Sequence, residues 1–169
     1  MAFNLQLVVL LCVSSGLWMG ANARCPKKDE CCMACPDGWT RFEGRCFKFH
    51  FGPKGWCDAE SQCINEGGNL ASIRTVKELE ILRNFTKLTT GQEARTWMGG
   101  FDAVKEDCWQ WADGYKFDFD SWAPGEPNNY GPGEHCMEMS HTETQPINDA
   151  PCNIEKAFIC SRDLERKEA

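Results

Sequence analysis

The sequence lacks the motifs of the common hydrolytic, metalloprotease and nucleotide-binding enzymes. It contains no G-x-S-x-G, no H-E-x-x-H and no phosphate-binding glycine loop. Its three histidines, His50, His135 and His141, have no evident catalytic partner nearby in the sequence. We therefore expect a binding protein and not an enzyme.

The chain also lacks an excess of positive charge. It has 18 Lys and Arg against 25 Asp and Glu, which gives a formal net charge of −7. Nucleic-acid binding depends on clusters of Lys and Arg that neutralise phosphates. The balance therefore argues against a nucleic-acid partner and is compatible with cation binding.

Charged side chains are missing from the first 23 residues. An apolar run from Leu5 to Val13 is followed by small residues that end in Ala21-Asn22-Ala23, as in a secretory signal peptide. The run is shorter than the ~20 apolar residues that span a bilayer, and no second such stretch follows. We expect cleavage after Ala23, secretion to the extracellular space and no membrane span.

Cysteine, in contrast, is abundant. Of the twelve cysteines, Cys12 lies in the predicted signal peptide and eleven remain. In an oxidising compartment this density predicts a disulfide framework, and an odd number leaves a free thiol or an interchain bond. The cysteines at residues 25–35 could instead form a zinc site, but no histidine completes the set of ligands.

The first half of the chain predicts a hairpin and a helix. Pro36-Asp37-Gly38 is a turn, and the alternating aromatics after it predict a β-hairpin closed by Cys35 and Cys46. Residues 55–68 have the spacing of a short amphipathic helix that ends at two glycines.

A second helix is predicted to begin at Thr75, because Glu78 follows three residues later as in a capping box. Its apolar positions are Val76, Leu79, Leu82 and Phe85. Residues 95–100 and 156–160 are predicted strands.

Residues 108–122 alternate aromatic and polar side chains, with Asp113-Gly114 as a tight turn. We expect a strand with the Phe side chains inward and Asp118 and Asp120 outward, in preference to a metal site at the two aspartates. These segments predict an α+β fold, with two helices beside small antiparallel sheets.

Residues 123–150 have little periodicity and many Gly, Pro and Asn. A stretch this long in a compact domain is usually functional. Three of its carboxylates and two of its amides are candidate ligands: Glu126, Asn128, Glu134, Asn148 and Asp149.

These side chains suit calcium, which takes six to eight oxygen ligands. Glu126 and Asn128 share one face of an extended chain, and a cis bond before Pro127 would turn both carbonyl oxygens toward one ion. Cys136 and Cys152 flank the later segment and could close it over the site. The alternative is that all of these are ordinary turn residues.

From about Cys35 to Cys160 the chain resembles the C-type lectin-like domain family, and most of all its small secreted fish lectins, relatives of the type II antifreeze proteins. The resemblance is carried by "CPDGWTRFEGRCFKF", "WCDAESQCINEGGNLASI", "WMGG", "EPNN", "CMEM" and "NDAPC…FIC". It implies a double-looped α+β domain and the disulfides Cys35–Cys46, Cys63–Cys160 and Cys136–Cys152.

The resemblance also implies a calcium ion that binds sugar. Its ligands, for both the metal and the sugar, would be Glu126, Asn128, Glu134, Asn148 and Asp149. The Glu-Pro-Asn triplet is similar to that of the mannose-type class, so mannose-type glycans on microbial or host surfaces are the implied partner, in innate defence.

Three departures from the family pattern stand out. Ile147 occupies the position before Asn-Asp where Trp is common, and the segment "HTETQP" before it also differs. An auxiliary calcium site would use Asp102 and Glu106, but two other expected acids are Asn129 and His135. We expect this auxiliary site to be weak or missing.

The expected organisation has four parts: a signal peptide at 1–23, a Cys-rich extension at 24–34, a C-type lectin-like domain at 35–162 and a charged tail at 163–169. Beyond the three implied disulfides, Cys25, Cys31, Cys32, Cys57 and Cys108 are left without an assigned partner. We expect the N-terminal cluster to form a disulfide-linked homo-oligomer. Asn84-Phe85-Thr86 is an N-glycosylation sequon.

Two other functions compete with a calcium-dependent lectin. One is ice binding, because the type II antifreeze proteins share the domain. The other is a calcium-independent protein-binding module, which the loss of Trp at Ile147 favours.

Overall fold

The computed structural model describes residues 34–90, 94–140 and 146–164. In chain order these form β1 (Thr40–Phe42), β2 (Arg45–Lys54), α1 (Trp56–Asn65), β3 (Asn69–Leu70), α2 (Val76–Thr90), β4 (Thr96–Phe101), β5 (Gln110–Trp111), β6 (Cys136–Met139), β7 (Ile147–Ala150) and β8 (Lys156–Asp163).

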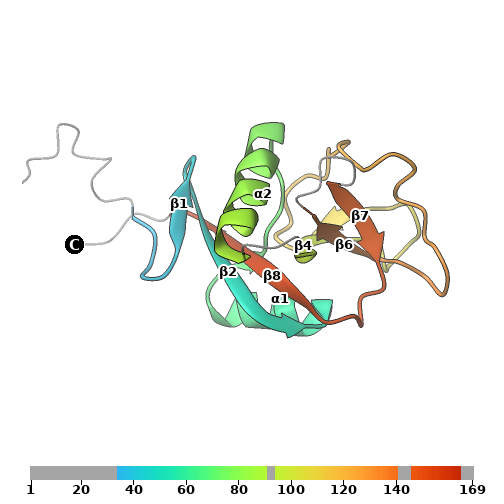
Figure 1. The fold of residues 1–169 in the computed structure, drawn as a ribbon, viewed down its shortest axis with the longest axis horizontal. Helices are drawn as coiled ribbons and strands as arrows, with labels where there is room; N and C mark the ends of the chain where they lie inside the picture. The colour runs from blue at the N-terminus through green and yellow to red at the C-terminus, as the bar shows by residue number, and fades with distance from the viewer. Residues whose placement is uncertain (1–33, 91–93, 141–145, 165–169) are drawn as a thin grey trace, which may run out of the picture. The chain divides into compact units, whose positions relative to one another are not determined.

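The strands form one mixed sheet in the order β1-β2-β8-β4-β6-β7, with β3 added to β8 and β5 added to β4. Every pairing is antiparallel except that of β4 with β8. The α+β class with two helices is confirmed, but the separate small antiparallel sheets are in fact one sheet. The parallel β4–β8 pairing is what joins the β1–β2 hairpin to the β6–β7 ribbon (Figure 1).

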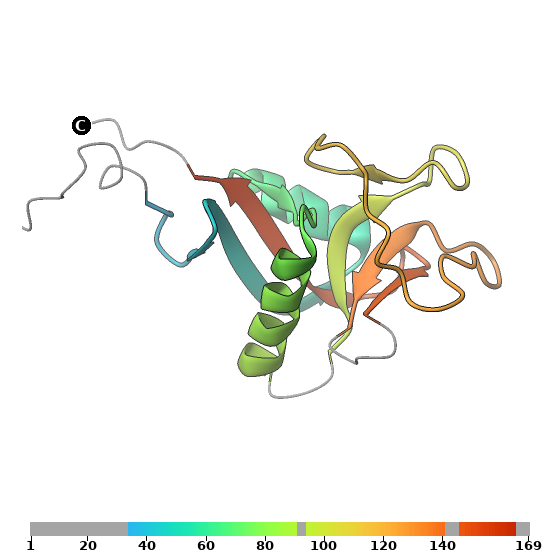
Figure 2. The same cartoon turned by 90° about the horizontal axis from the view of Figure 1, so that it is seen from above.

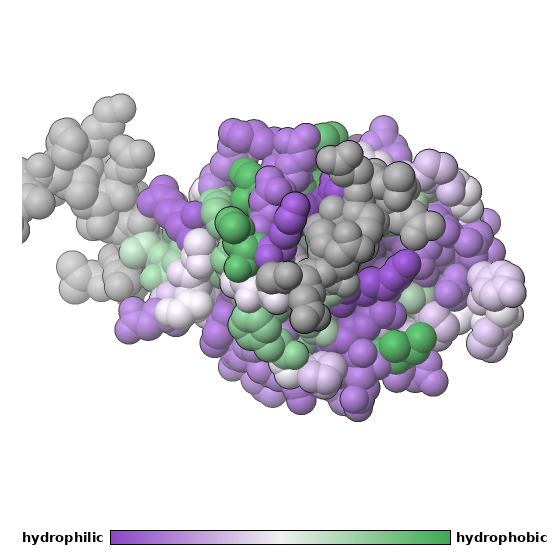
Figure 3. All heavy atoms as spheres, viewed as in Figure 1, coloured by the Kyte–Doolittle hydropathy of each residue, from purple (hydrophilic) through white to green (hydrophobic). Residues whose placement is uncertain are grey.

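The two helices lie against opposite faces of the sheet. Successive residues of one strand point to opposite faces, so a central strand can contact both helices. On β8, Phe158 and Cys160 pack with Ala59 of α1, whereas Ile159 packs with Leu82 of α2. Alternate side chains of β8 therefore belong to two different hydrophobic clusters, one on each face of the sheet. The face drawn in Figure 3 is largely hydrophilic, with small separate hydrophobic patches.

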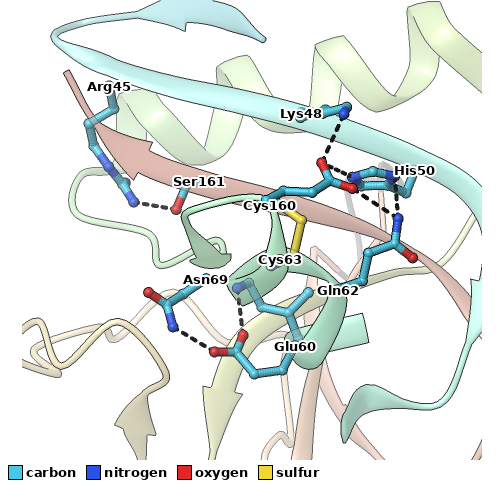
Figure 4. The surroundings of a disulfide bond; sticks show 11 residues. Arg45, Lys48, His50, Glu60, Gln62, Cys63, Asn69, Cys160 and Ser161 are labelled. Atoms are coloured by element: carbon cyan, nitrogen blue, oxygen red, sulfur yellow. Dashed lines mark hydrogen bonds and ion pairs between the residues drawn. A yellow bond between two sulfur atoms is a disulfide. The ribbon is translucent and has the colours of Figure 1, made fainter. Parts of the chain in front are cut away.

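Three disulfides staple this arrangement, as the resemblance implied: Cys35–Cys46, Cys63–Cys160 and Cys136–Cys152. The second joins α1 to β8, beside the polar contacts drawn in Figure 4. In the described part of the chain, Cys57 and Cys108 are unpaired and exposed. The other three cysteines without an assigned partner lie outside the described residues.

His50 has the structural role expected of it. Its ring stacks on Phe158 with centroids 4.6 Å apart, and its Nε2 lies 3.3 Å from Glu66. Burial lowers the pKa of His50, although the neighbouring Glu66 carboxylate opposes this shift. The side chain therefore packs as a largely neutral ring in the α1 face of the sheet.

The start of α2 follows the predicted cap with one difference. Thr75 Oγ1 accepts the backbone N–H of Glu78 at 3.0 Å, but Glu78 Oε2 accepts from Arg74 N and not from Thr75 N. The predicted apolar face also needs correction, because Val76 is 62% exposed while Glu78 is buried. Glu78 is drawn inward by Arg45, whose Nη1 lies 2.6 Å from its Oε1.

The tight turn predicted at Asp113-Gly114 is confirmed, because Gly114 has a φ of 72° and its N–H donates to Trp111 O at 3.0 Å. The strand predicted after this turn is wrong, because β5 ends at Trp111 and no strand follows it within residues 112–122. Phe117 and Phe119 are half-buried and Asp118 and Asp120 exposed, so the side chains divide as expected without a strand. The reason is that the Phe rings pack on Trp111 and its aromatic neighbours, 5.0 and 6.0 Å away, instead of pairing with another strand.

Several predictions lie outside the described residues. At the ends of the chain these are the signal peptide, the Cys-rich extension apart from residue 34, and the tail beyond residue 164. Within the chain they are His141 and the rest of the segment "HTETQP" up to residue 145. The domain boundaries remain predictions. β8 includes Asp163, the first residue of the predicted tail. Within the described segments, no helix is long and apolar enough to cross a membrane.

The sequon at Asn84 lies on α2. Asn84 is exposed, whereas Thr86 is only 1% exposed and donates its hydroxyl to Leu82 O at 2.9 Å. Phe85 is half-buried between the rings of Phe42 and Phe49. A glycan on Asn84 would point to solvent, and its presence remains a prediction.

We predict that Glu78→Ala costs about 3 kcal/mol of unfolding free energy, because it removes the nearest carboxylate from the buried Arg45 guanidinium and leaves only Asp113 and Asp163, 3.7 and 3.8 Å away. The matched control is Lys77→Ala, which removes only the exposed Lys77–Glu43 pair and should leave the unfolding free energy nearly unchanged. Urea unfolding of both variants measures the difference. Equal costs would show that the Arg45–Glu78 pair does not stabilise the fold.

Candidate functional site

The loop between β5 and β6 extends at the side of the sheet away from β1, next to the β6–β7 ribbon (Figure 2). Ala123 N donates to Ile147 O at 2.9 Å, which ties the middle of this loop to β7. Ile147 itself is fully buried in the core. Although Ile replaces the Trp common in the family, this position still packs beneath the loop and anchors it.

The carboxylate of Asp149 holds the next part of the loop. This residue is 1% exposed, and its two oxygens accept the backbone N–H groups of Asn128 at 3.2 Å and Asn129 at 2.8 Å. The Glu126–Pro127 bond just before them is cis. Asp149, which lies more than twenty residues after Glu126 and Asn128 in the sequence, therefore meets them at one place.

Glu134 closes the following turn. Its Oε2 accepts the backbone N–H of Tyr130 at 3.0 Å, and its own N–H donates to Asn129 Oδ1 at 2.6 Å. These two bonds cross the turn in opposite directions, so Glu134 is fixed next to the residues held by Asp149.

The acidic side chains repel one another. Burial, followed by the nearby Asp149 carboxylate, raises the pKa of Glu126 above its usual range. Burial also raises the pKa of Glu134, and Asp149 and Glu138 add to the shift. Neighbouring carboxylates disfavour one another's ionisation, and a cation between them would relieve this repulsion.

The hydrogen bonding of Glu126 also favours a bound cation. Its Oε2 is buried and has no hydrogen-bond partner among the described residues. A buried acceptor without a donor is costly, and a cation would satisfy it. The site therefore fits calcium on its donor chemistry and on its charge.

Sequence reasoning missed Glu138 of β6, which lies opposite Asn148 on β7. Glu138 is 2% exposed, accepts Asn148 Nδ2 at 3.0 Å, and pairs with Arg95 and with Lys156 Nζ at 3.0 Å. Asn148 Nδ2 also donates to Asp149 O. With both amino hydrogens used inside the protein, Asn148 Oδ1 is the atom left for a cation. The sequence signal that could have identified Glu138 is its position between the two methionines of "CMEM", where a strand would bury it.

The structure thus brings together the predicted site residues. Glu126, Glu134 and Asp149 interact through their carboxylates, Asn128 joins them through its backbone N–H, and Asn148 lies beside them on β7. Asp102 and Glu106 form a separate cluster with His135.

Comparison with known proteins gives a consistent picture. Residues 52–162 match the model of the lectin C-type domain. The chain is 39% identical over 156 residues to the galactose-specific lectin nattectin of Thalassophryne nattereri, covering 92% of this chain and 95% of nattectin. It is also 40% identical over 118 residues to ladderlectin of Oncorhynchus mykiss, covering 70% of this chain and 62% of ladderlectin.

Two solved structures have the same fold at a TM-score of 0.70. One is the carbohydrate-recognition domain of cow CD23 in the presence of a GlcNAc2Man3 oligosaccharide, 33% identical, covering 78% of this chain and 98% of that one. The other is a calcium-independent type II antifreeze protein, 31% identical, covering 79% and 97%. The fold is therefore shared by a carbohydrate-recognition domain and an antifreeze protein.

We predict that Glu126→Gln raises the midpoint of thermal unfolding in EDTA at neutral pH. A carboxyl whose pKa is raised by folding favours the folded state when protonated, so its ionised form destabilises the protein as pH rises through that pKa. The gain from the substitution should disappear as pH falls below the ordinary value of 4.5. The exposed Glu80→Gln on α2 is the control and should show no such pH dependence. A gain that persists unchanged at acid pH would contradict the repulsion described above.

Proposed function

Since the chain belongs to the C-type lectin domain family, whose members bind and do not catalyse, we propose that it is a secreted, calcium-dependent lectin for mannose-type glycans. The ligands of the ion and of the sugar are Glu126, Asn128, Glu134, Asn148 and Asp149. The observation that carries the proposal is the group of mutually repelling, half-buried carboxylates around the unpartnered Oε2 of Glu126.

The arrangement suits binding of a sugar to a protein-held ion. Five side chains supply fewer oxygens than the six to eight that calcium prefers, and two neighbouring sugar hydroxyls can complete its shell. Carboxylates such as Glu126 and Glu134 accept hydrogen bonds from these hydroxyls, while the amide of Asn128 donates. Asn128 is exposed and can reach a ligand, whereas the amino group of Asn148 is already engaged by Glu138.

The identity of the sugar is the finer part of the proposal. The Glu-Pro-Asn triplet favours mannose-type hydroxyls, and the related CD23 domain was solved with a mannose-containing oligosaccharide. Nattectin, which is named a galactose-specific lectin, supports the other sugar class. We assign mannose because Glu126 would accept hydrogen bonds from the sugar hydroxyls and Asn128 would donate to them, and this order of acceptor and donor is that of the Glu-Pro-Asn triplet.

Assembly would make such a site effective. A single open site for a monosaccharide binds near the millimolar range, about −4 kcal/mol, and linked sites raise avidity by ~10²–10⁴. We propose that the N-terminal cysteine cluster links chains into an oligomer that recognises glycan-coated microbial or host surfaces in innate defence. The apolar leader supports an extracellular location.

Ice binding is the second candidate, and the antifreeze structure of the same fold is what favours it. That protein is calcium-independent, whereas the carboxylates here repel one another and would be stabilised by a bound cation. A calcium-independent partner module is disfavoured by the same observation. Thermal hysteresis of the purified protein distinguishes ice binding from sugar binding.

We predict that the protein is retained on mannose-agarose in calcium and released by EDTA, with little retention on galactose-agarose. The double variant Glu126→Gln/Asn128→Asp exchanges donor and acceptor on both sides of Pro127. It should lose retention on mannose at least tenfold and gain it on galactose, measured from the eluted fractions.

The exposed substitution Glu80→Gln should leave both columns unchanged. Calcium-dependent retention of the wild type on galactose alone would keep the calcium site but refute the mannose assignment. Absence of retention on both sugars would refute the proposed function.

A further inference from the structure

A second cluster of metal-ligand side chains lies where β4 leaves the sheet and β6 enters it. Phe101 of β4 pairs with Cys136 of β6, so the residues just beyond them, Asp102 and His135, are neighbours. His135 Nδ1 lies 3.0 Å from Asp102 Oδ1 and 3.6 Å from Glu106 Oε2. The ligand atoms of these three side chains all lie within 4.8 Å of one another.

The backbone fixes this cluster in place. Asp102 is 2% exposed, and its Oδ2 accepts the backbone N–H of Asp107 at 2.9 Å. Asp102 N donates to His135 O at 3.2 Å, and Lys105 N donates to Asp102 O at 2.9 Å. Asp102 Oδ1 is therefore held toward the imidazole, and Glu106 is brought back by the same turn.

The cluster does not fit calcium, which the family resemblance implied at Asp102 and Glu106. Calcium takes six to eight oxygen ligands, and here the third side chain offers an imidazole nitrogen. Asn129, at the position of another expected acid, presents Nδ2 to Glu106 at 2.6 Å. Its Oδ1 is occupied by the backbone N–H of Glu134, so the amide cannot turn its oxygen to the cluster.

One nitrogen and two carboxylates are instead a donor set for Zn²⁺ or a similar transition ion. Tetrahedral zinc with bonds of about 2.0–2.2 Å separates its ligand atoms by about 3.3–3.6 Å. Of the two separations around His135 Nδ1, the one of 3.6 Å falls within that range and the one of 3.0 Å is shorter. Small side-chain rotations would equalise them, because His135 and Glu106 are partly exposed.

We propose that Asp102, Glu106 and His135 form a site for a zinc-class divalent ion, with solvent as the remaining ligand. The replacement of an expected acid by His135 converts an oxygen site into a mixed nitrogen and oxygen site. This site is separate from the five calcium ligands and does not depend on sugar binding.

The test is calorimetric titration of the untagged, purified protein with Zn²⁺, in excess calcium so that zinc does not enter the other carboxylate group. We expect one zinc ion per chain, and His135→Asn should weaken its binding at least tenfold. Substitution with Co²⁺ adds a spectroscopic readout, because four-coordinate cobalt has strong visible absorption that His135→Asn should abolish.

Two controls separate this site from other zinc ligands and from unfolding. The double variant Cys57→Ser/Cys108→Ser, which removes the two exposed thiols, should bind zinc as the wild type does. An unchanged midpoint of thermal unfolding in EDTA shows that His135→Asn is folded; if it is not, Glu106→Gln replaces it, with the same expected loss. The proposal is overturned by wild-type protein that binds no zinc, by a folded ligand variant with undiminished affinity, or by loss of zinc in the thiol variant.

Discussion

The buried carboxylate of Asp149 accepts the backbone N–H groups of Asn128 and Asn129, and the geometry of the whole binding loop depends on these two hydrogen bonds. Asp149 belongs to a strand of the sheet, so it transfers the rigidity of the core to a segment that has no regular structure. The same carboxylate raises the pKa of Glu126. One side chain thus orders the loop and creates the negative charge that a cation can neutralise.

Asn129 connects the two metal-ligand groups of the molecule. Its backbone N–H is held by Asp149, its Oδ1 accepts from Glu134 N, and its Nδ2 donates to Glu106. An aspartate at this position could not make the last contact as a donor. The amide therefore ties the two loops together without a second calcium ion, and leaves His135 and the neighbouring carboxylates as a site of different chemistry.

Much of the fold could be predicted because its signals are local. The cap at Thr75, the glycine end of α1 and the cysteine positions identify elements directly, and the family resemblance supplied the pairing of the cysteines. Three features depended on tertiary contacts that no local pattern contains. The parallel pairing of β4 with β8 joins distant segments, Arg45 draws Glu78 inward in place of Val76, and aromatic packing replaces strand pairing after Trp111.

The predicted site residues were found from their oxygen atoms and from the resemblance, but their surroundings could not be. Glu138 acquires its role only because β6 and β7 pair in a register that places it opposite Asn148. The orientation of Asn129 likewise follows from contacts across the loop.

The most direct test of the account is a calorimetric titration of the calcium-stripped protein with Ca²⁺. We expect one ion per chain, with affinity in the range of about 10⁻⁴–10⁻³ M that is common in extracellular modules. Absence of calcium binding would contradict the site built around Asp149. Two equivalents of calcium would contradict the conclusion that the donor set at His135 excludes this ion.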